Sequence, residues 1–512
     1  MGMIIHVYSH SFIVATNDRR FKQIANVFVT NRLVVEKFQI GKPAKGKTQS
    51  KGTVFAAANP TRTQFYLPLA LFDEFKLALI SCGVRENEYE IVYHKPKKGA
   101  KVEINFIAKF KMSELQERCL DFVRCDPVRR IAPLQTGKGK TALSLYFMCE
   151  YGRRTMITMN AKYIPRWVMD LVGDEAKVDL LPEDLIVVQG LKELKKYIQQ
   201  VRSGELEFKV IMISNTTMAL FHDDVLENPS EWKKLGIKIP NDIFTILKVG
   251  FRIRDEAHEH LHFNFKFDLF THCSKTLDLS ATLIYDDQGM ERMSKIVYPL
   301  EDRFDQGKWD THIEAYSVNY RLKPTTKLKW TQGWQGPYNH NQMETSILAN
   351  NAYMSDFKMI VLKLVETLFI EPVLAEGKKE VCLIYASTKD MCTQLATFLQ
   401  SVFTELDVNR KIGGDDYEEL LTADIIVSTP KSAGTAVDIP RLGVIINTVN
   451  ISSTQAIVQM AGRLRPAEGI ISRFYYLTCL DIPQHNKYHN EKQTKLKGVV
   501  KSLGVIDTTY RL

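Results

Sequence analysis

The sequence predicts an α/β protein in which two tandem parallel-sheet domains follow a small, basic α+β domain. Short apolar strands alternate with helical segments through most of the chain, and a charged stretch at 301–312 interrupts this alternation once. The first 110 residues carry the whole excess of positive charge. Strands that alternate with helices favour parallel sheets, whose ligands bind at the carboxyl ends of the strands.

The expected domain boundaries divide the 512-residue chain into four segments. These are a basic α+β domain at 1–108, a first parallel-sheet domain at 109–305, a second one at 306–484 and a basic helical tail at 485–512. Runs of β-branched and aromatic residues predict strands in the basic domain at 4–14, 33–40, 53–57 and 89–94, and helical spacing predicts a helix at 67–83. The parallel strands are expected at 130–134, 156–159, 185–190, 210–214, 250–255 and 275–280, and then at 313–318, 381–387, 424–429, 444–449 and 474–479.

The charge distribution indicates an anionic partner. Residues 1–110 contain 17 Lys and Arg against 8 Asp and Glu, whereas the other 402 residues contain 51 of each. A basic domain joined to a neutral body is typical of nucleic-acid binding. The eight Cys are scattered without a C-x-x-C pair, so neither a zinc site nor a disulfide framework is indicated. No apolar run reaches the ~18 residues of a membrane span. We therefore expect a cytoplasmic protein without a signal peptide or membrane contact.

Two stretches resemble a phosphate loop, and their context separates them. GKPAKGKT at 41–48 fits the pattern G-x-x-x-x-G-K-[ST] at every fixed position, but a strand-like run follows it instead of a helix. A phosphate loop must leave a strand and open a helix, so that backbone N–H groups converge on the phosphates. We therefore interpret this stretch as the basic tip of a hairpin. Its lysines are either solvated or grip nucleic-acid phosphates; they are Lys42, Lys45, Lys47 and Lys51.

The second stretch, LQTGKGKT at 134–141, has the required context although Leu134 replaces the first Gly. A short strand leads into it, and a segment with helical spacing follows. We expect this loop to bind ATP, with Lys140 as the phosphate clamp and the Thr141 hydroxyl as a ligand of Mg²⁺. The expected nucleotide-binding residues of the loop are Thr136, Gly137, Lys138, Gly139, Lys140 and Thr141.

The stretch DEAH at 255–258 supplies the second half of the predicted site. It follows the strand-like run FRIR, so both carboxylates are expected at a strand end. Asp255 there suits Mg²⁺ binding, and Glu256 suits polarisation of the attacking water. The phosphate loop and these carboxylates together predict an ATP hydrolase.

Thr-Gly-x-Gly-Lys-Thr followed by Asp-Glu-Ala-His is the signature of superfamily 2 helicases and translocases, which the chain therefore resembles between residues 110 and 480. The resemblance implies two RecA-like motor domains with ATP bound between them. It also implies that Gln116 reads adenine. Coupling of hydrolysis to domain movement is assigned by the resemblance to His258, Ser280, Ala281 and Thr282.

The resemblance also implies roles in the second domain and on the nucleic-acid side. Asp438 matches the fifth motif, with Ala436 in place of the usual Gly, and Gln459 belongs to the sixth motif. Arg463 and Arg465 are both candidates for the arginine that stabilises charge on the γ-phosphate. Nucleic-acid contacts are expected at Asn160, Ser214, Thr216 and Thr217, and at the aromatic pair Trp330 and Trp334, whose alternative role is hairpin packing.

The layout of a basic α+β domain before the motor is similar to that of the phage recombination helicases of the UvsW type. This similarity implies a monomeric DNA helicase or translocase that unwinds or branch-migrates forks and junctions in recombination, repair or replication restart. Three alternatives remain: an RNA helicase, the motor subunit of a restriction or nuclease complex, and an ATP-independent nucleic-acid clamp. The presence of Lys140, Asp255 and Glu256 disfavours the clamp.

Overall fold

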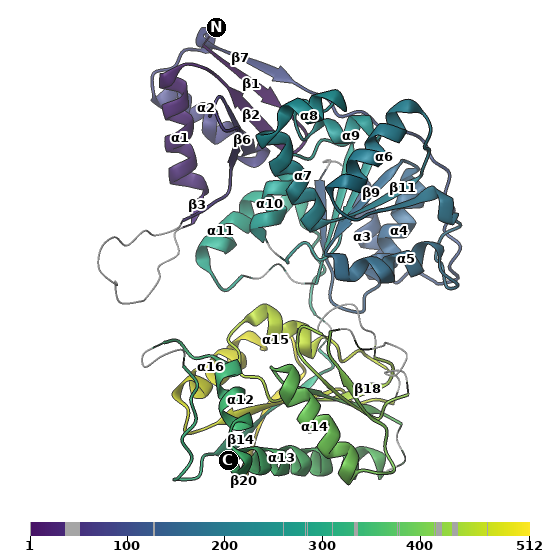
Figure 1. Cartoon of the computed structure of the whole chain (residues 1–512), viewed down its shortest axis with the longest axis vertical. Helices are drawn as coiled ribbons and strands as arrows, with labels where there is room; N and C mark the ends of the chain where they lie inside the picture. The colour runs from purple at the N-terminus through teal and green to yellow at the C-terminus, as the bar shows by residue number, and fades with distance from the viewer. Residues whose placement is uncertain are drawn as a thin grey trace. The chain divides into compact units, whose positions relative to one another are not determined.

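The computed structural model divides into two compact units, Met1–Gln306 and Gly307–Leu512. Figure 1 shows both units, with the first in purple to teal and the second in green to yellow. The structure describes residues 2–35, 52–125, 129–259, 261–281, 283, 285–309, 311–331, 336–375, 377, 379–413, 415, 422–432, 439–467 and 469–512.

The N-terminal part of unit 1 is built on a small mixed sheet with the strand order β5-β6-β2-β1-β7. Its strands are β1 (Met3–Val7), β2 (Ser11–Ala15), β5 (Ala57–Ala58), β6 (Gln64–Pro68) and β7 (Tyr89–Tyr93), and β3 (Val34–Val35) pairs separately with β4 (Thr53–Val54). The single strand expected at 4–14 is a hairpin, because the backbone turns between Tyr8 and Ser11, where Tyr8 N donates to Ser11 O.

Two helices cover this sheet, and sequence reasoning found only one of them. Helix α2 (Phe72–Ser81) lies within the expected range 67–83, whose first residues belong instead to β6. Helix α1 (Arg19–Leu33) was missed. Its signals are an Asp18 side chain that accepts from Arg20 N at its start and buried Phe21, Ala25 and Phe28 at helical spacing.

The second part of unit 1 is a parallel sheet with the strand order β10-β11-β9-β12-β13-β8. The strands are β8 (Arg129–Pro133), β9 (Thr155–Met159), β10 (Leu185–Val188), β11 (Val210–Ser214), β12 (Phe251–Arg254) and β13 (Lys275–Ser280), all close to the predicted ranges. One face packs against α3 (Glu114–Arg124), α4 (Lys140–Tyr151) and α5 (Ile164–Val172). The other face packs against α6 (Leu191–Ser203), α7 (Asn215–Glu227), α8 (Pro229–Lys234) and α9 (Asp242–Ile246).

The described residues of the small mixed sheet and its helices share a hydrophobic core with the parallel-sheet part of unit 1. Buried side chains of β1, β2, β6, α1 and α2 pack with those of α10 (Leu261–Leu269) and α11 (Gln288–Val297). Polar contacts reinforce this junction, because the imidazole of His10 bonds to Thr276 Oγ1 over 3.1 Å and Ser11 Oγ donates to Leu269 O over 2.7 Å. The basic N-terminal part is therefore anchored directly to strand β13.

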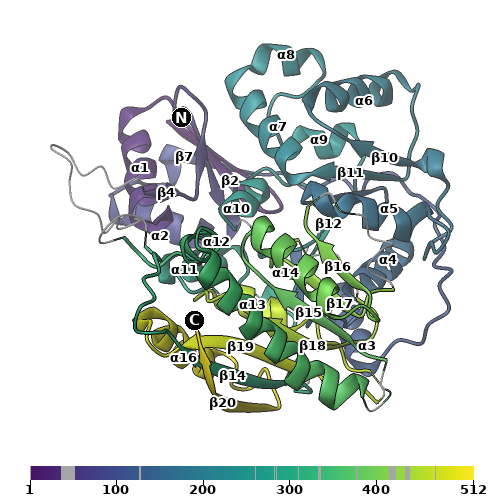
Figure 2. The same cartoon turned by 60° about the horizontal axis from the view of Figure 1, so that its bottom comes forward.

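Unit 2 is a second parallel sheet with the strand order β16-β17-β15-β18-β19-β14-β20. The strands are β14 (Glu314–Arg321), β15 (Val381–Tyr385), β16 (Val408–Lys411), β17 (Ile425–Ser428), β18 (Leu442–Asn447), β19 (Arg473–Cys479) and β20 (Ser502–Arg511). Figure 2 shows α13 (Asn351–Val365) and α14 (Lys389–Val402) beside each other on one face, where α12 (His340–Leu348) also packs. The opposite face packs against α15 (Thr454–Ala461) and the residues that follow α16 (Pro483–Lys495).

The helical tail expected at 485–512 is wrong in its second half. Helix α16 ends at Lys495, and residues 502–511 form strand β20, which pairs in parallel with β14. Leu496, Val500 and Leu503 have helical spacing, but the chain turns at Gly498, whose φ is +85°. This left-handed conformation favours glycine and ends the helical path. None of the helices in the described ranges is both long and apolar enough to span a bilayer.

Candidate active site

The loop at 134–141 leaves strand β8 and opens helix α4, as the sequence predicts. Gly137 and Gly139 adopt φ values of +82° and +71°, which side-chain-bearing residues rarely adopt. These conformations place successive N–H groups at the beginning of α4, where the helix dipole also favours an anion. Lys140 Nζ donates to Leu134 O over 3.1 Å, so the lysine side chain folds back onto the first residue of the loop.

Gln116 lies directly against this loop. Its Nε2 donates to Lys138 O over 3.1 Å, while its Oε1 accepts from Ser113 N in a capping box at the start of α3. A Cβ atom at position 139 would lie 2.5 Å from Gln116 Nε2, so the contact also requires glycine there. Among the other loop residues, Thr136, Lys138 and Thr141 are partly exposed and Gly137 is exposed.

The carboxylates of the DEAH stretch lie near this loop because β8, β13 and β12 are neighbours in the sheet. Asp255 follows β12, and both of its oxygens are held: Oδ2 accepts from Trp167 Nε1 over 2.8 Å, and Oδ1 accepts from Glu256 N over 2.9 Å. Burial, and then the charge of Glu256, raises the pKa of Asp255 to about 6, while the positive charge of Lys140 acts in the opposite direction. The charges of Lys140 and Asp255 therefore interact.

Glu256 has a strained backbone and a partner in the same motif. Its φ is +48°, a left-handed conformation that costs a residue with a side chain roughly 1–2 kcal/mol. Its carboxylate lies 3.2 Å from His258 Nδ1, which is also 2.9 Å from Ser280 Oγ. Burial lowers the pKa of His258 to about 4, so the imidazole is neutral at physiological pH. His258 thus connects Glu256 to the end of β13, where the buried Ala281 follows.

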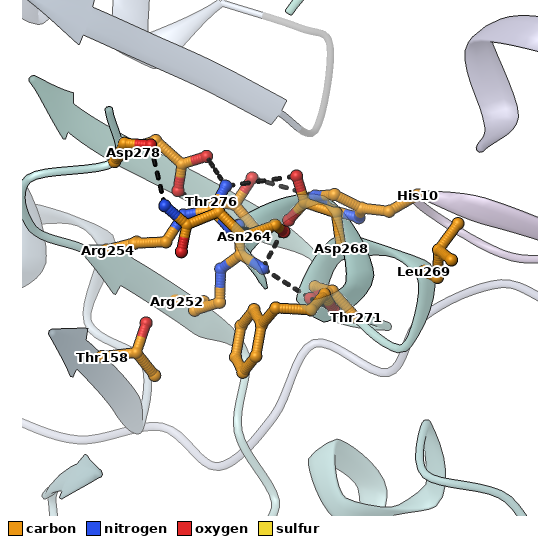
Figure 3. A network of polar contacts seen from close by, with 12 residues as sticks. His10, Thr158, Arg252, Arg254, Asn264, Asp268, Leu269, Thr271, Thr276 and Asp278 are labelled. Carbon is orange, nitrogen blue, oxygen red and sulfur yellow. Dashed lines mark hydrogen bonds and ion pairs between the residues drawn. The ribbon is translucent and has the colours of Figure 1, made fainter. Parts of the chain in front are cut away.

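A buried ionic network lies beneath these motifs on β12 and β13 (Figure 3). Arg252 Nη1 donates to Asp268 over 2.8 Å, and its Nη2 donates to Asp278 over 3.1 Å. Arg254 Nη2 contacts both Asp268 and Asp278, and it also donates to the Tyr298 hydroxyl over 2.6 Å. Both arginines are fully buried. Two cations and two anions therefore tie the strand that ends in Asp255 to the strand that ends in Ser280 and to α10.

Sequence reasoning missed this network, as well as the donor role of Trp167. The available signals are the two Arg at alternate positions of a strand predicted to be buried, and an Asp inside the run TLDLS. A buried strand tolerates such charges only when opposite charges and hydrogen bonds compensate them.

The residues expected to contact nucleic acid differ in their exposure. Ser214 and Thr217 are buried and cap α7, where Ser214 Oγ accepts from Thr217 N over 3.1 Å. Thr216 is exposed beside them. Asn160 is partly exposed, and its side chain accepts from Lys162 N at the 3₁₀ turn Ala161–Tyr163. Thr216 and Asn160 therefore remain accessible for a phosphate contact, whereas Ser214 and Thr217 shape the loop.

In unit 2, the predicted residues of the sixth motif lie on and just after α15. Gln459 belongs to the helix, and Arg463 and Arg465 follow its end; all three are partly exposed. Trp330 packs beside the core, and the next residue, Thr331, forms an isolated antiparallel bridge with Tyr338. The remaining predicted residues lie outside the described part of the chain; they are Lys42, Lys45, Lys47, Lys51, Thr282, Trp334 and Asp438.

The described residues fit a nucleotide with Mg²⁺. The positive φ values of Gly137 and Gly139 build the backbone cradle that phosphates require, and Lys140 supplies the cation. Thr141 and Asp255 provide the hydroxyl and carboxylate oxygens that Mg²⁺ prefers, and few protein ligands are needed because phosphates and water complete its shell. Thr141 and Asp255 would hold the ion.

No family model matches the sequence, and no curated protein matches it. Among solved structures, the ATP-dependent Type ISP restriction-modification enzyme LlaBIII bound to DNA is similar with a TM-score of 0.51 and 12% identity, covering 85% of this chain and 36% of that enzyme. T4 UvsW matches with a TM-score of 0.35 and 12% identity over 99% of this chain and 100% of that chain. A fragment of a putative HsdR subunit of a type I restriction enzyme from Vibrio vulnificus YJ016 matches with a TM-score of 0.46 and 13% identity, over 77% and 67% of the two chains.

The likeness to LlaBIII concerns the fold. It confirms two parallel-sheet α/β domains, preceded here by the small mixed sheet. The predicted fold class and the predicted resemblance are therefore confirmed at the level of architecture.

Proposed function

We propose that this chain is an ATP-dependent nucleic-acid motor of the superfamily 2 type, acting as a DNA helicase or translocase. The observation that carries the proposal is that the glycine loop between β8 and α4 and the carboxylates after β12 belong to one sheet, where β13 alone separates β8 from β12, although 115 positions separate Lys140 from Asp255 in the sequence. A glycine loop at a helix start, a lysine and two strand-end carboxylates form the set of groups that phosphoryl transfer to water requires.

In the proposed mechanism, backbone N–H groups of the loop 136–141, other than that of Lys138, which donates to Gln135 O, bind and orient the phosphates, and Lys140 neutralises their charge. Mg²⁺ held by Thr141 and Asp255 would supply further neutralisation of the phosphate charge. Glu256 accepts the proton of the attacking water. His258 and Ser280 pass changes at Glu256 to the end of β13 through the contacts of 3.2 and 2.9 Å.

The finer proposal concerns the substrate. The excess of nine positive charges within residues 1–110 supports binding of duplex DNA through its backbone, with strong salt dependence and little sequence preference. The anchoring of this basic part on β13 supports a role close to the motor. We propose branched DNA, that is forks and junctions, as the preferred substrate, with unwinding or branch migration as the outcome.

The experiment that tests this function measures ATP hydrolysis at near-physiological salt with no nucleic acid, single-stranded DNA, duplex DNA, a four-way junction and RNA. Lys140→Ala serves as the blank. Strongest stimulation by the junction supports the proposal. Strongest stimulation by RNA, with DNA inert, identifies an RNA remodeller instead. Equal stimulation by plain duplex favours a duplex translocase such as a restriction motor, and binding without turnover identifies a clamp.

The contribution of unit 2 is tested by two matched variants, Arg463→Ala and Arg465→Ala. The resemblance assigns charge stabilisation at the γ-phosphate to one of these residues. The variant that removes the acting arginine should lower kcat by ~10³-fold or more. The other variant should keep most of the turnover, and a loss below tenfold in both would remove the sixth motif from the proposed mechanism.

A further inference from the structure

The segment that follows β9 is hydrogen-bonded to the DEAH stretch and to Glu259, the residue after it. At one end, Trp167 Nε1 donates to Asp255 Oδ2 over 2.8 Å. At the other end, the Tyr163 hydroxyl donates to Glu259 Oε1 over 2.6 Å, and Lys162 Nζ lies 3.3 Å from the same oxygen. Helix α5 begins at Ile164 and joins the two points rigidly. The segment expected to contact nucleic acid is thus attached to the segment expected to hydrolyse ATP.

The side chains of Tyr163, Lys162 and Glu259 differ in how far they are exposed to solvent. Tyr163 is buried, with 3% of its surface exposed, so its bond to Glu259 is fixed. The Lys162 side chain is 44% exposed and that of Glu259 is 18% exposed. Asn160, the neighbour of this pair in the same turn, is also accessible. The ammonium group of Lys162 therefore lies where a phosphate can reach it, and Glu259 is its counter-charge in the absence of nucleic acid.

The backbone of Glu259 belongs to a tight turn that contains the hydrolytic carboxylate. Glu259 N donates to Glu256 O over 2.9 Å. The buried Asn264 side chain clamps the turn, because its Nδ2 donates to Ala257 O over 2.8 Å and to Glu259 O over 2.6 Å. A displacement of the Glu259 side chain should therefore also move Glu256, because a short, hydrogen-bonded turn joins the two residues.

We propose that Glu259 is a positioning residue that shares Lys162 with a backbone phosphate of the bound nucleic acid and thereby couples nucleic-acid binding to ATP hydrolysis. This inference rests on the proposed function. An arriving phosphate attracts Lys162 and repels the Glu259 carboxylate, so the ion pair opens while the bond to Tyr163 persists. Because such coupling is reciprocal in free energy, a change at the carboxylates also changes the affinity of the 160–163 turn for phosphate.

The first experiment measures the binding of a single-stranded oligo(dT) probe without nucleotide, over a series of salt concentrations. Glu259→Gln releases Lys162 and should tighten binding roughly two- to fivefold, the range of one partly exposed ion pair. Lys162→Ala should weaken binding and reduce the salt slope by about one unit, the share of one phosphate contact. In the Lys162→Ala background, Glu259→Gln should have no effect.

A matched control is available in the same unit. Glu231 pairs with Lys195 over 2.8 Å on the helices that cover the other face of the sheet, so Glu231→Gln removes a more exposed ion pair, and Lys195 keeps its contact with Asp224. It should leave both affinity and salt slope unchanged. The sharing of Lys162 is overturned if Glu259→Gln binds the probe with wild-type affinity. It is also overturned if Glu259→Gln tightens binding in the Lys162→Ala background.

The second experiment measures the ratio of DNA-stimulated to unstimulated ATP hydrolysis. Glu259→Gln and Tyr163→Phe should each lower this ratio severalfold, whereas Glu231→Gln should not. Tyr163→Phe keeps the buried ring and removes only the hydroxyl, which guards against loss of folding. An unchanged ratio in both variants, with the wild-type protein stimulated by DNA, overturns the coupling and leaves the proposed function standing. If the wild-type protein does not hydrolyse ATP, both the proposed function and the coupling of nucleic-acid binding to hydrolysis are refuted. The binding experiment then still decides whether Lys162 is shared between Glu259 and a phosphate.

Discussion

The indole of the buried Trp167 donates a 2.8 Å hydrogen bond to the carboxylate of Asp255, and the bond orients that carboxylate from outside the motif. Oδ1 of Asp255 is held by Glu256 N, so both oxygens are directed before any ligand binds. Groups that orient a metal-binding carboxylate in this way commonly contribute 10–100-fold to metal affinity or activity. Asp255 is therefore pre-positioned by the side chain of a neighbouring strand-end segment.

The first prediction follows from this bond. Trp167→Phe should raise the Mg²⁺ concentration that gives half-maximal ATP hydrolysis about tenfold, because the carboxylate loses its orienting donor. The check is a Mg²⁺ titration of the hydrolysis rate. Trp232→Phe is the control, since Trp232 is equally buried and its Nε1 donates to Asp224 over 2.9 Å in the same unit, away from the site. Equal Mg²⁺ dependence in the two variants would contradict the assigned role.

The second prediction separates the backbone and the carboxylate of Glu256. Glu256→Gly and Glu256→Ala should both reduce kcat at least 100-fold, because each removes the general base. Glu256→Gly should nevertheless be more stable than Glu256→Ala by about 1 kcal/mol, because only glycine adopts the φ of +48° without strain. Denaturant unfolding of the two variants measures the difference. At Gln199, an exposed position inside α6, the order should reverse, with alanine more stable than glycine.

The third prediction concerns the buried ionic network. Asp278→Asn should lower the free energy of unfolding by about 3–5 kcal/mol, because it leaves two buried guanidinium groups undercompensated. The more exposed pair Lys209–Asp184, with 2.9 Å between its charged atoms, provides the control. Asp184→Asn should cost no more than about 1 kcal/mol. Chemical denaturation monitored by intrinsic fluorescence compares the two variants. Similar losses in the free energy of unfolding would show that the network is not desolvated.

The fourth prediction is a loss of stability below neutral pH. Burial lowers the pKa of His258 and of His272 to about 4 from the usual 6.5, and it lowers that of the fully buried His222 well below its usual value. The unfolded chain then binds more protons than the folded chain between pH 6.5 and pH 4. The stability that these three histidines contribute is therefore fully present above pH 6.5 and is lost as the pH falls toward 4, while the raised pKa of Asp255, about 6, offsets part of the loss.

Thermal unfolding of unit 1 should consequently shift to lower temperature by several degrees between pH 7 and pH 5. His272 makes a T-shaped contact with Tyr8 at 5.0 Å between ring centroids. His272→Phe retains an aromatic ring that cannot be protonated, so its unfolding midpoint should depend less steeply on pH. A slope equal to that of the wild-type protein would exclude His272 as a contributor.

Most parallel strands of both units could be predicted from the sequence because they are short, mainly apolar runs between turn formers. Strands β8 to β15 and β17 to β19 lie at or within a few residues of the expected positions. The phosphate loop and the DEAH stretch were found for a similar reason, since each combines a local pattern with a strand before it. Strand β16 (Val408–Lys411) was missed because VNRK lacks that apolar character.

What could not be predicted depends on partners distant in the sequence. The pairing of Trp167 with Asp255 spans 88 positions, and that of Tyr163 with Glu259 spans 96. Nothing in the sequence distinguishes Trp167 or Tyr163 from an aromatic residue that only packs in the core. Likewise, a helix pattern extended across Gly498 could not reveal that β14 offers an unpaired edge to residues 502–511.

The pairing of β20 with the edge of β14 can form only late in the synthesis of the chain. Asn319 in β14 bonds to Asp507 in β20 across 188 positions, and the bond of 2.8 Å forms only after the later residue has emerged from the ribosome. Unit 1 contains its own sheets and can complete its core earlier, because domains generally fold from the N-terminus during synthesis. Until β20 arrives, one side of β14 is an open hydrogen-bonding edge, which is a template for association with other chains. Unit 2 should therefore be the part of this protein that most needs protection by chaperones while it is being made.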